Sequence, residues 1–508
     1  MGISLVSKIL SLGLDGADGY IVTAECFLSG GLPSFDVVGL PDASVKESRD
    51  RVRASIKNLG ADFPKNKITI NLAPAGTKKE GPIYDLPILI GILVAATQLP
   101  EIPTDCAFIG ELSLNGELRA ARGVLSMAIA AKEKGVKKLF VPFENAKEAS
   151  LAGEEISVYG IKSAGELVRY FKNEETLSVE PVWKPEKAQV KLLDFSDVKG
   201  QENVKRALEI AAAGGHNILM IGPPGSGKSM LAERIPSILP DMTYEESLKT
   251  TSLHSIRGLV SNEQPLVTCR PFRSPHHTAT TVALSGGGAA LLPGELSLSH
   301  NGILFLDELP EFRRDTLEIL RQPMETGEIT ISRAAGSVTY PARFMLVCAM
   351  NPCKCGWRGY EGDAHECTCS EQSVNNYMGK ISGPLLDRID IHISVPAVTY
   401  DDMSQNKQGE SSSEIRKRVN AARSRAHARG VVCNAQLSGS QLRKIIQLDD
   451  AASSLLKAAF DSLGLTGRSY DKILRLALTI SDLAGSDVVL ASHIAEAIQY
   501  RSLDRAAD

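Results

Sequence analysis

The sequence contains few aromatic residues and no long hydrophobic run. Aromatic residues occupy 5% of the 508 positions, and only two residues are tryptophan. The longest apolar runs, such as residues 86–96, are too short for a membrane span, which takes roughly 20 apolar residues. Residues 1–13 hold one lysine in a short apolar stretch, with no signal-peptide cleavage pattern after it. We therefore expect a cytoplasmic protein with no membrane partner.

Cysteine content and net charge are also low. Nine cysteines in a chain of 508 residues do not indicate the disulfide framework of a small secreted protein, so they suggest free thiols or metal ligands. The formal net charge of −4 excludes a globally basic nucleic-acid-binding protein. It does not exclude a local basic surface, which is what sets phosphate affinity. The length exceeds what one hydrophobic core supports, so several domains are expected.

Composition along the chain indicates an α/β protein with linkers between its domains. Residues 1–172 alternate strand-like and helix-like stretches, and the polar, proline-containing residues 173–193 are interpreted as a linker. Apolar strands alternate with helices over residues 194–398, which is typical of a parallel α/β core. The polar residues 399–413 form a second expected linker, and residues 414–508 show helical periodicity without strands.

A glycine-rich turn is the most informative pattern in the chain. Residues 218–232 predict a buried strand, a phosphate-binding loop and a helix. The glycines allow backbone angles that let successive N–H groups converge on phosphate oxygens, beside the positive end of the helix. Lys228 would reach the β- and γ-phosphates of ATP, and the Ser229 hydroxyl would bind Mg²⁺. The predicted nucleotide-binding residues are Gly222, Pro223, Pro224, Gly225, Ser226, Gly227, Lys228 and Ser229.

Two carboxylates follow an apolar strand downstream of this loop. Residues 303–306 predict a buried strand, and Asp307 and Glu308 stand at its carboxyl end, the edge at which open α/β sheets bind ligands. Asp307 is placed to hold Mg²⁺ through water, and Glu308 is placed to polarise the attacking water as a general base. The alternative interpretation is a core strand that ends in a solvated acidic turn.

Asn351 and Arg388 are further candidates for the same site. Asn351 ends the apolar run 344–350, where its amide can orient the lytic water or the γ-phosphate; a turn-forming asparagine before Pro352 is the alternative. Arg388 lies in a loop between a helix and a strand, which suits an arginine finger supplied to the ATP of a neighbouring subunit. The alternative for Arg388 is a salt-bridged loop residue.

These motifs carry a family resemblance that covers nearly the whole chain. The sequence resembles the magnesium-chelatase-like group of AAA+ ATPases, specifically the YifB/ComM family, which implies an AAA+ core with a C-terminal helical lid. The resemblance implies that Asn351 is sensor 1, Arg388 the arginine finger and Arg468 the sensor 2 arginine. It also implies a homo-hexameric ring, because the finger acts on a neighbour. The resembling segments are residues 270–277, 286–288, 293–298, 300–312, 351–353, 382–390 and 466–475.

Two insertions stand out in the expected ATPase core. Residues 243–296 resemble the helix-2 insert of this AAA+ group. Residues 328–341 alternate around a turn and predict a β-hairpin, which resembles the pre-sensor-1 hairpin that projects into the pore of related helicases. Arg333 near its tip would contact a DNA phosphate backbone, and a solvated hairpin charge is the alternative. For His276 and His277 we favour turn or pore-facing roles over metal binding.

Four of the nine cysteines lie close together in residues 353–369. They form two Cys-x-Cys pairs, and four thiolates in one short loop suit a tetrahedral Zn²⁺ site. Such an ion would staple a loop that has little other support. The alternative is a set of reduced thiols on a flexible loop. The predicted zinc ligands are Cys353, Cys355, Cys367 and Cys369.

The first domain resembles the proteolytic domain of Lon-type proteases. Enzymes of that type use a serine nucleophile with a lysine base, since a weak nucleophile needs an adjacent base. The lysine position falls within residues 124–127, which hold no lysine, and the serine-bearing turn falls within residues 80–85, which hold no serine. We therefore expect a Lon-protease-like (S5-type) α/β fold without peptidase activity.

The sequence suggests three functions, which we compare here. The family resemblance implies an ATP-driven DNA motor, a helicase or branch-migration factor on single-stranded and branched DNA that aids DNA integration in natural transformation, alongside recombination proteins. The alternative is a magnesium-chelatase-like ATPase that remodels a protein or metal-insertion partner, although such a subunit would not be expected to carry a Lon-like domain. An ATP-dependent protease is disfavoured by the absent dyad.

Overall fold

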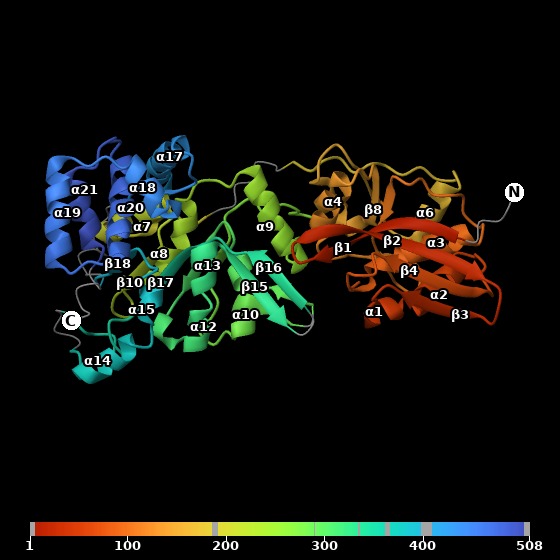
Figure 1. Cartoon of the computed structure of the whole chain (residues 1–508), viewed down its shortest axis with the longest axis horizontal. Helices are drawn as coiled ribbons and strands as arrows, with labels where there is room; N and C mark the ends of the chain where they lie inside the picture. The colour runs from red at the N-terminus through yellow and green to blue at the C-terminus, as the bar shows by residue number, and fades with distance from the viewer. Residues whose placement is uncertain are drawn as a thin grey trace.

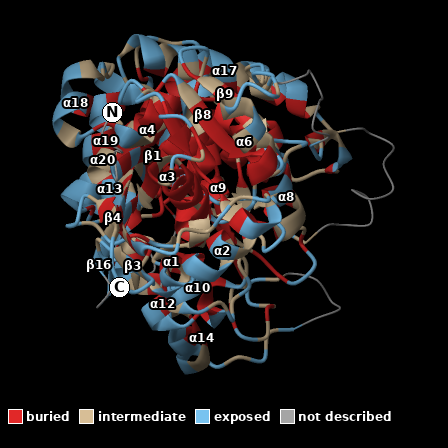
Figure 2. Ribbon diagram, turned by 90° about the vertical axis from the view of Figure 1, so that its right-hand side faces the viewer, coloured by how far each residue is buried: buried red, intermediate tan, exposed pale blue. Residues whose placement is uncertain are grey.

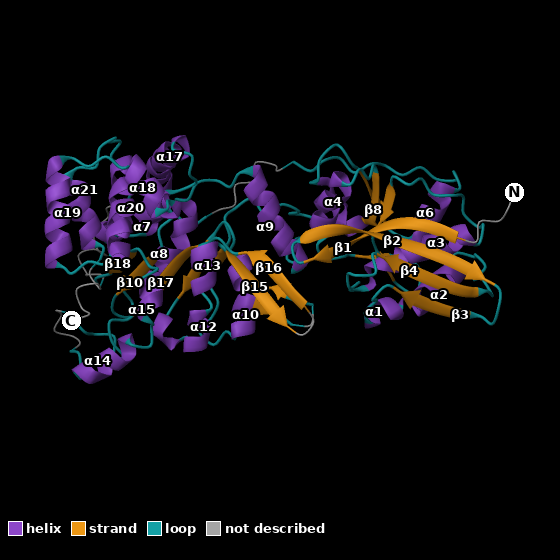
Figure 3. Ribbon diagram, viewed as in Figure 1, coloured by secondary structure: helices purple, strands orange, loops and turns teal. Residues whose placement is uncertain are grey.

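The computed structural model describes residues 6–184, 192–288, 290–333, 336–360, 366–397 and 409–501. Three parts follow one another along the longest axis of the molecule: an N-terminal domain, a nucleotide-binding core and a helical lid (Figure 1). Figure 3 shows strands and helices together in the N-terminal domain and a helical lid. In the described part of the chain, no helix has the length and apolar character that crossing a membrane requires.

The N-terminal domain is built on a mixed seven-stranded sheet. The strands β1 (Val6–Asp15) and β2 (Asp18–Ser29) pair antiparallel along their whole length. Alternating apolar residues in β4 (Lys67–Ala73) turn one face of that strand into the core. The strand order is β3-β4-β2-β1-β5-β8-β9, with β3 (Ser34–Val38), β5 (Cys106–Phe108), β8 (Lys138–Pro142) and β9 (Ser157–Ile161). The short strands β6 (Glu111–Leu112) and β7 (Leu118–Arg119) pair separately.

Six helices accompany this sheet in the described residues of the domain. The central one, α3 (Asp85–Ala95), is buried almost throughout because its sequence is apolar on every face. The others are α1 (Ala43–Lys46), α2 (Ser48–Asn58), α4 (Val124–Glu133), α5 (Ala146–Ser150) and α6 (Ala164–Phe171). Figure 2 shows buried residues gathered around α3, α4 and β8, whereas α14, beyond this domain, is mostly exposed.

The nucleotide-binding core contains a five-stranded sheet in which every pairing is parallel. Its order is β11-β14-β17-β10-β18, with β11 (Phe272–Arg273), β14 (Ile303–Leu306), β17 (Met345–Met350), β10 (Ile218–Ile221) and β18 (Ile391–Ser394). The strands β14 and β17 are buried at every residue, as expected of central parallel strands. The carboxyl ends of all five strands therefore meet at one edge, where the phosphate-binding loop, Asp307 and Asn351 follow their strands.

Helices and two small β-elements complete the core. The segment that resembles a helix-2 insert contains α9 (Tyr244–Ile256), α10 (Thr281–Ser285), β12 (Gly286–Gly287), β13 (Leu292–Pro293) and the start of α11 (Glu295–Leu298). The strands β15 (Glu328–Arg333) and β16 (Gly336–Pro341) pair antiparallel as a hairpin, whose residues 334–335 lie outside the described part. The remaining helices are α7 (Glu202–Gly214), α8 (Lys228–Arg234), α12 (Arg314–Glu318), α13 (Arg321–Thr326), α14 (Glu371–Met378) and α15 (Gly383–Leu386).

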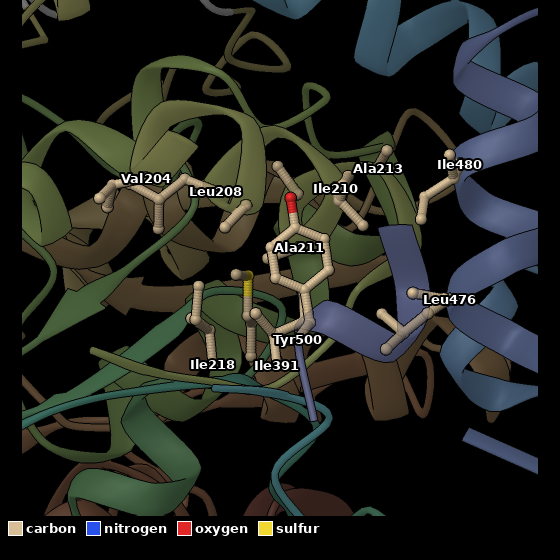
Figure 4. Close-up of a cluster of buried hydrophobic side chains, with 14 of the residues drawn as sticks. Val204, Leu208, Ile210, Ala211, Ala213, Ile218, Ile391, Leu476, Ile480 and Tyr500 are labelled. Carbon is tan, nitrogen blue, oxygen red and sulfur yellow. The ribbon is translucent and has the colours of Figure 1, made fainter. Parts of the chain in front are cut away.

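The lid consists of α17 (Ser412–Ala428), α18 (Gly439–Ile445), α19 (Asp450–Ser462), α20 (Gly467–Leu483) and α21 (Ala491–Gln499). It shares one hydrophobic core with the nucleotide-binding sheet. Figure 4 shows this core where Leu476 and Ile480 of α20 approach α7 and Tyr500 lies beside Ile391 and Ile218.

The two expected linkers are only partly described. Residues 185–191 and 398–408 lie outside the described part. Residues 173–184 form no helix or strand, but the backbone N–H of Glu180 donates to Val158 at 2.8 Å, so this stretch lies along the N-terminal domain. The helix α17 begins at Ser412, within the expected second linker, because the Ser411 hydroxyl caps it by accepting from the N–H of Glu414.

The N-terminal domain contacts the core mainly through α9. Leu125 and Leu151 of the domain pack with Leu266 of the core in a small separate cluster. The carboxylate of Glu148, buried in this contact, accepts a hydrogen bond from the hydroxyl of Ser255 at the end of α9. The turn between β1 and β2 also reaches the hairpin of β15 and β16. In Figure 1, α9 stands between the N-terminal domain and the remainder of the core.

Candidate functional site

The phosphate-binding loop connects β10 to α8 as the sequence pattern predicts. Gly225 and Gly227 adopt φ values of +74° and +85°, which residues with a Cβ resist. Gly222 has no room for a side chain, because a Cβ would lie 2.2 Å from the carbonyl oxygen of Val395. The loop therefore needs glycine at these three positions for backbone reasons, and α8 begins directly after it at Lys228.

Lys228 is folded back onto its own loop. Its Nζ donates to the carbonyl oxygens of Gly222 and Pro223, both at 2.8 Å, and lies 3.3 Å from the Asn351 Oδ1. Burial lowers the pKa of Lys228 below its usual value, and the nearby Asp307 carboxylate opposes that shift. The amine thus contacts both its own loop and Asn351, the predicted sensor residue.

Ser229 and Asp307 lie together at the carboxyl edge of the sheet. The Ser229 hydroxyl donates to the Asp307 Oδ2 at 2.6 Å, and the backbone N–H of Glu308 donates to the Asp307 Oδ1 at 2.9 Å. A hydroxyl and a carboxylate oxygen are the hard ligands that Mg²⁺ prefers. Lys228, Ser229, Asp307 and Asn351, predicted from separate segments, are therefore brought into one site.

Glu308 lies at the same edge of the sheet as Asp307, but its carboxylate contacts His277. It adopts φ +51°, an unusual left-handed conformation for a residue with a side chain. Its Oε2 lies 3.1 Å from the His277 Nδ1. The predicted general base is thus adjacent to Asp307 in sequence, while its carboxylate contacts the insert segment.

Arg388 and Arg468 have no contact with Lys228, Ser229 or Asp307 among the described residues. The Arg388 guanidinium pairs with Glu325 of α13 and donates to the carbonyl oxygen of Pro384 at 2.5 Å. Arg468 is exposed in the first turn of α20. Neither residue is placed at the phosphate-binding loop of its own chain.

Arg333 is exposed at the end of β15 and lies beside the helix-2-like insert. A Cβ built on Gly287 of β12 would lie 3.8 Å from the Arg333 Nε. The hairpin leads through residues 342–344 into β17, which ends beside Asn351. The hairpin is therefore connected covalently to Asn351, the predicted sensor residue, by one buried strand.

The four cysteines predicted as metal ligands come together. The Cys353 Sγ lies 3.3 Å from that of Cys355 and 3.7 Å from that of Cys367, and all four sulfur atoms lie within 4.8 Å of one another. The intervening residues 361–365 lie outside the described part. The loop also abuts the phosphate-binding loop, since a Cβ on Gly356 would lie 2.6 Å from the Pro224 Cδ.

Sequence reasoning missed two residues at this site. Gln201, before α7, donates from its Nε2 to the carbonyl oxygen of Ser226 at 2.8 Å and so supports the phosphate-binding loop. His277 contacts Glu308, a role that differs from the turn or pore-facing roles expected of it. The contact between His277 and Glu308 follows from the pairing of β11 with β14, which the sequence analysis did not predict. A strand of two residues is too short to show the alternating pattern by which strands are recognised.

The fold and this site define a P-loop nucleotide-binding protein of the AAA+ type. Family models of the magnesium chelatase subunit ChlI match residues 194–403, those of the ChlI C-terminal region match residues 409–501, and those of subunit ChlI of Mg-chelatase match residues 24–145. The chain belongs to the YifB/ComM family of magnesium-chelatase-like AAA+ proteins.

Relatives of known sequence support this assignment over the whole length. The chain is 43% identical to YifB of Escherichia coli and 42% identical to the competence protein ComM of Haemophilus influenzae. Each alignment covers 99% of this chain and 98% of the relative. The magnesium-chelatase 38 kDa subunit of Rhodobacter capsulatus is 27% identical over 31% of this chain and 50% of its own length.

The family implies ATP and Mg²⁺ as ligands, and the residues present fit both. The loop glycines and Lys228 would hold the phosphates, while Ser229 and Asp307 would hold the ion. ATP with Mg²⁺ supplies the phosphoanhydride bond and the metal charge that neutralises its phosphate oxygens.

Proposed function

We propose that the protein is an ATP-driven DNA motor, a helicase or branch-migration factor that acts on single-stranded and branched DNA. The connection from the hairpin that carries Arg333 through β17 to Asn351 carries this proposal, because a phosphate backbone that moves the hairpin would also move a residue touching Lys228. The competence protein ComM is a relative along its whole length. We therefore place the motor in DNA integration during natural transformation, in the cytoplasm and alongside recombination proteins.

The proposed motor is a homo-hexameric ring. Arg388 does not contact the nucleotide loop of its own chain in the described residues, and its guanidinium pairs with Glu325 of α13, the helix that leads into the hairpin. An arginine finger that acts on a neighbouring subunit needs this separation from its own loop. Arg468 on the lid would complete the composite site with the same ATP.

ATP turnover measured with and without single-stranded or forked DNA tests the motor. We expect DNA to raise turnover and, with ATP, to assemble rings that light scattering detects. Lys228→Ala should lose nucleotide binding, and Glu308→Gln should bind ATP without turning it over. If DNA changes neither turnover nor assembly, the motor is rejected. If Glu308→Gln hydrolyses ATP normally, the general base is another group.

A variant of the hairpin separates DNA contact from ATP chemistry. Arg333→Ala should weaken DNA binding and reduce the salt dependence of binding by about one phosphate contact. Arg313→Ala is the matched control, since Arg313 is also exposed but pairs with Asp315 at 3.0 Å outside the hairpin. Equal DNA affinities for the two variants would remove Arg333 from the DNA path.

The second candidate function is a magnesium-chelatase-like ATPase that remodels a protein or metal-insertion partner. It is favoured by the 27% identity to the magnesium-chelatase 38 kDa subunit, over 31% of this chain. The two functions differ in what stimulates turnover. Stimulation by DNA supports the motor, whereas turnover that is indifferent to DNA and rises with a protein partner supports the remodeller.

We also propose that Cys353, Cys355, Cys367 and Cys369 hold one Zn²⁺ ion. Four sulfur ligands at about 2.3 Å from a tetrahedral zinc are about 3.8 Å apart. The sulfur distances of 3.3, 3.6 and 3.7 Å among Cys353, Cys355 and Cys367 are close to that spacing. Because the cysteine-containing loop packs against Pro224, the ion would also stabilise the part of the protein that supports the phosphate-binding loop.

Elemental analysis of the purified full-length chain tests the zinc site. We expect one zinc per chain, retained by Cys269→Ser and lost by Cys367→Ser, since Cys269 stands outside the cluster. Metal-free protein should unfold at a lower temperature and turn over ATP more slowly. A metal-free preparation with unchanged unfolding and turnover would reject the proposal.

A further inference from the structure

The turn between β1 and β2 in the N-terminal domain reaches the hairpin of β15 and β16 in the core. It consists of Gly16 and Ala17, since Asp15 and Asp18 form the last pair of the two strands. Gly16 has φ +63°, and two-residue hairpin turns favour glycine where φ is positive. Figure 1 shows this end of the β1–β2 ribbon beside the hairpin.

The turn contacts the hairpin at Val338 of β16. A Cβ built on Gly16 would lie 2.7 Å from the Val338 Cγ1, so there is no room for a side chain beside that methyl group. Leu14 and Ala17, on either side of Gly16, pack against the hydrophobic cluster that contains Tyr340 of the same hairpin. The N-terminal domain and the hairpin therefore share a close apolar contact.

The hairpin needs such a contact because it is a sheet of two strands, separate from the core sheet. Two paired strands alone are only marginally stable in water. The buried pair of Ile329 and Tyr340 lies at the base of the hairpin, and Ile331 pairs with Val338 further out. The turn packs on this outer pair, and Arg333 follows Ile331 by two residues. The contact thus supports the part of the hairpin that lies close to Arg333.

The turn is itself fixed to the rest of the molecule. The strand β1 pairs with β2 over all ten of its residues, which makes the ribbon behind the turn continuous. A Cβ built on Gly123, just before α4, would lie 2.3 Å from the Leu14 Cδ1 and 3.3 Å from the Ile256 Cγ1 at the end of α9. Leu14 is therefore enclosed between the two domains, so the position of the N-terminal domain determines that of the turn.

We propose that this turn supports the hairpin that carries Arg333, so that the N-terminal domain fixes the position of Arg333 for contact with a DNA phosphate. The proposal rests on the proposed DNA motor, and it gives the N-terminal domain a function other than peptide hydrolysis. Gly16 is a positioning residue, because it acts on DNA only through the hairpin. A hairpin that is already held in place loses less conformational freedom on binding, so DNA binds it more tightly.

Hydrogen exchange of the hairpin, measured without DNA, tests the support. In Gly16→Ala we expect peptides that cover residues 328–333 and 336–341 to exchange about five- to tenfold faster, because the added methyl group overpacks the contact. Val338 cannot easily turn aside, since branching at its Cβ restricts χ1. Gly60→Ala is the matched control: Gly60 has φ +69°, and a Cβ there would meet no described atom within 4 Å. It introduces the same backbone strain and should leave the exchange of the hairpin unchanged.

A second substitution separates this contact from folding of the N-terminal domain. Val338→Ala removes the methyl group that the new Cβ of Gly16→Ala would meet. The two substitutions together should therefore return the exchange of the hairpin to within about twofold of the unmodified protein. Gly16→Ala alone should bind single-stranded DNA about threefold more weakly than Gly60→Ala, and the double variant should recover most of that loss.

Three results would overturn the proposal. The hairpin of Gly16→Ala could exchange at the same rate as that of Gly60→Ala, or Val338→Ala could fail to rescue it. Faster exchange of Gly16→Ala with an unchanged affinity for single-stranded DNA would be the third. All three differ from failure of the motor, which would appear as ATP turnover of the unmodified protein that DNA does not raise.

Discussion

The helical lid and the N-terminal domain both pack against the nucleotide-binding core, but only the lid shares a large hydrophobic core with it. Helices α7, α17 and α20 and the sheet of the core contribute to one continuous cluster. The N-terminal domain keeps two cores of its own and reaches the nucleotide-binding core chiefly through three leucines and the turn beside the hairpin. The lid is therefore part of the ATPase body, and the N-terminal domain is an attached unit.

A buried carboxylate lies at each of these junctions, and the two have opposite pKa shifts. Asp390, where the core meets α20, lies 3.9 Å from the Lys472 Nζ and 3.5 Å from the His216 Nδ1. Burial opposes the ionised form, but His216, Lys472 and the N–H of Asn217 outweigh it and lower the pKa of Asp390 to about 2.

Glu148, where the N-terminal domain meets α9, has neutral hydrogen-bond partners. They are the backbone N–H of Leu125 at 2.9 Å, the Asn145 amide at 3.1 Å and the Ser255 hydroxyl. Burial raises the pKa of Glu148 above its ordinary value, and these hydrogen bonds only reduce the shift. The ionised form of Asp390 therefore stabilises the lid junction at neutral pH, whereas the environment of Glu148 at the N-terminal junction favours the uncharged acid.

The largest effect is expected from breaking the lid junction. Asp390→Asn should destabilise the protein by about 3–5 kcal/mol, because it leaves the buried Lys472 ammonium without this counter-ion. Denaturant unfolding followed by circular dichroism measures the change. Asp471→Asn is the control on the same lid, since Asp471 forms a more exposed pair with Arg443 at 3.2 Å, of a kind worth about 1 kcal/mol or less. Equal losses for both variants would contradict the buried-charge account.

A smaller effect is expected from the apolar contact of the N-terminal junction. Leu266→Ala should cost about 2–3 kcal/mol through the cavity left against Leu125 and Leu151. The N-terminal domain should then separate more readily, so limited proteolysis between the domains should accelerate while the lid unfolds as before. Leu259→Ala serves as control because Leu259 is 52% exposed at the end of α9. Unchanged proteolysis of Leu266→Ala would show that this cluster does not hold the domains together.

The smallest expected effect is the pH dependence of stability, to which Asp390 and Glu148 contribute with opposite signs. The contribution of Asp390 is complete above its unfolded pKa of 3.8 and is lost as pH falls towards 2, because its folded pKa is depressed. The contribution of Glu148 is complete below its unfolded pKa of 4.5 and is lost as pH rises through its raised folded pKa.

Glu148→Gln should flatten the pH dependence of the N-terminal junction above pH 4.5. The net change at neutral pH should be about 1 kcal/mol or less, because the amide avoids a buried charge but loses the bond from Asn145. Proteolysis rates of the junction measured across pH check this. If the proteolysis rate of Glu148→Gln depends on pH in the same way as that of the unmodified protein, the raised pKa of Glu148 is contradicted.

Sequence patterns predicted the local parts of the nucleotide site well. The loop 222–229 and the strand that ends at Asp307 each follow from a short run of residues, since a glycine turn and a buried apolar strand are specified within about ten positions. Asn351 was placed by the same logic and lies 3.3 Å from Lys228. Gln201 was not found, because nothing around it in the sequence marks the distant carbonyl that it holds.

Contacts between distant segments depend on packing that no local pattern contains. Asp390 and Lys472 meet only because α20 docks on the end of the sheet, and Glu148 meets Ser255 only because α9 packs on the N-terminal domain. The contact between His277 and Glu308 depends on the register of a two-residue strand.

The sequence by itself determined the chemistry of this protein: the α/β class, the phosphate-binding loop, the acidic strand end and the four cysteines. Each of these is a choice of residue types over one turn or one strand, which local backbone preference and hydrophobic periodicity are sufficient to specify. The tertiary structure decided the arrangement: the shared core of lid and sheet, the sign of each buried carboxylate's pKa shift, and the orientation of Glu308. Those properties depend on partners that only the folded chain brings within a few ångströms of one another.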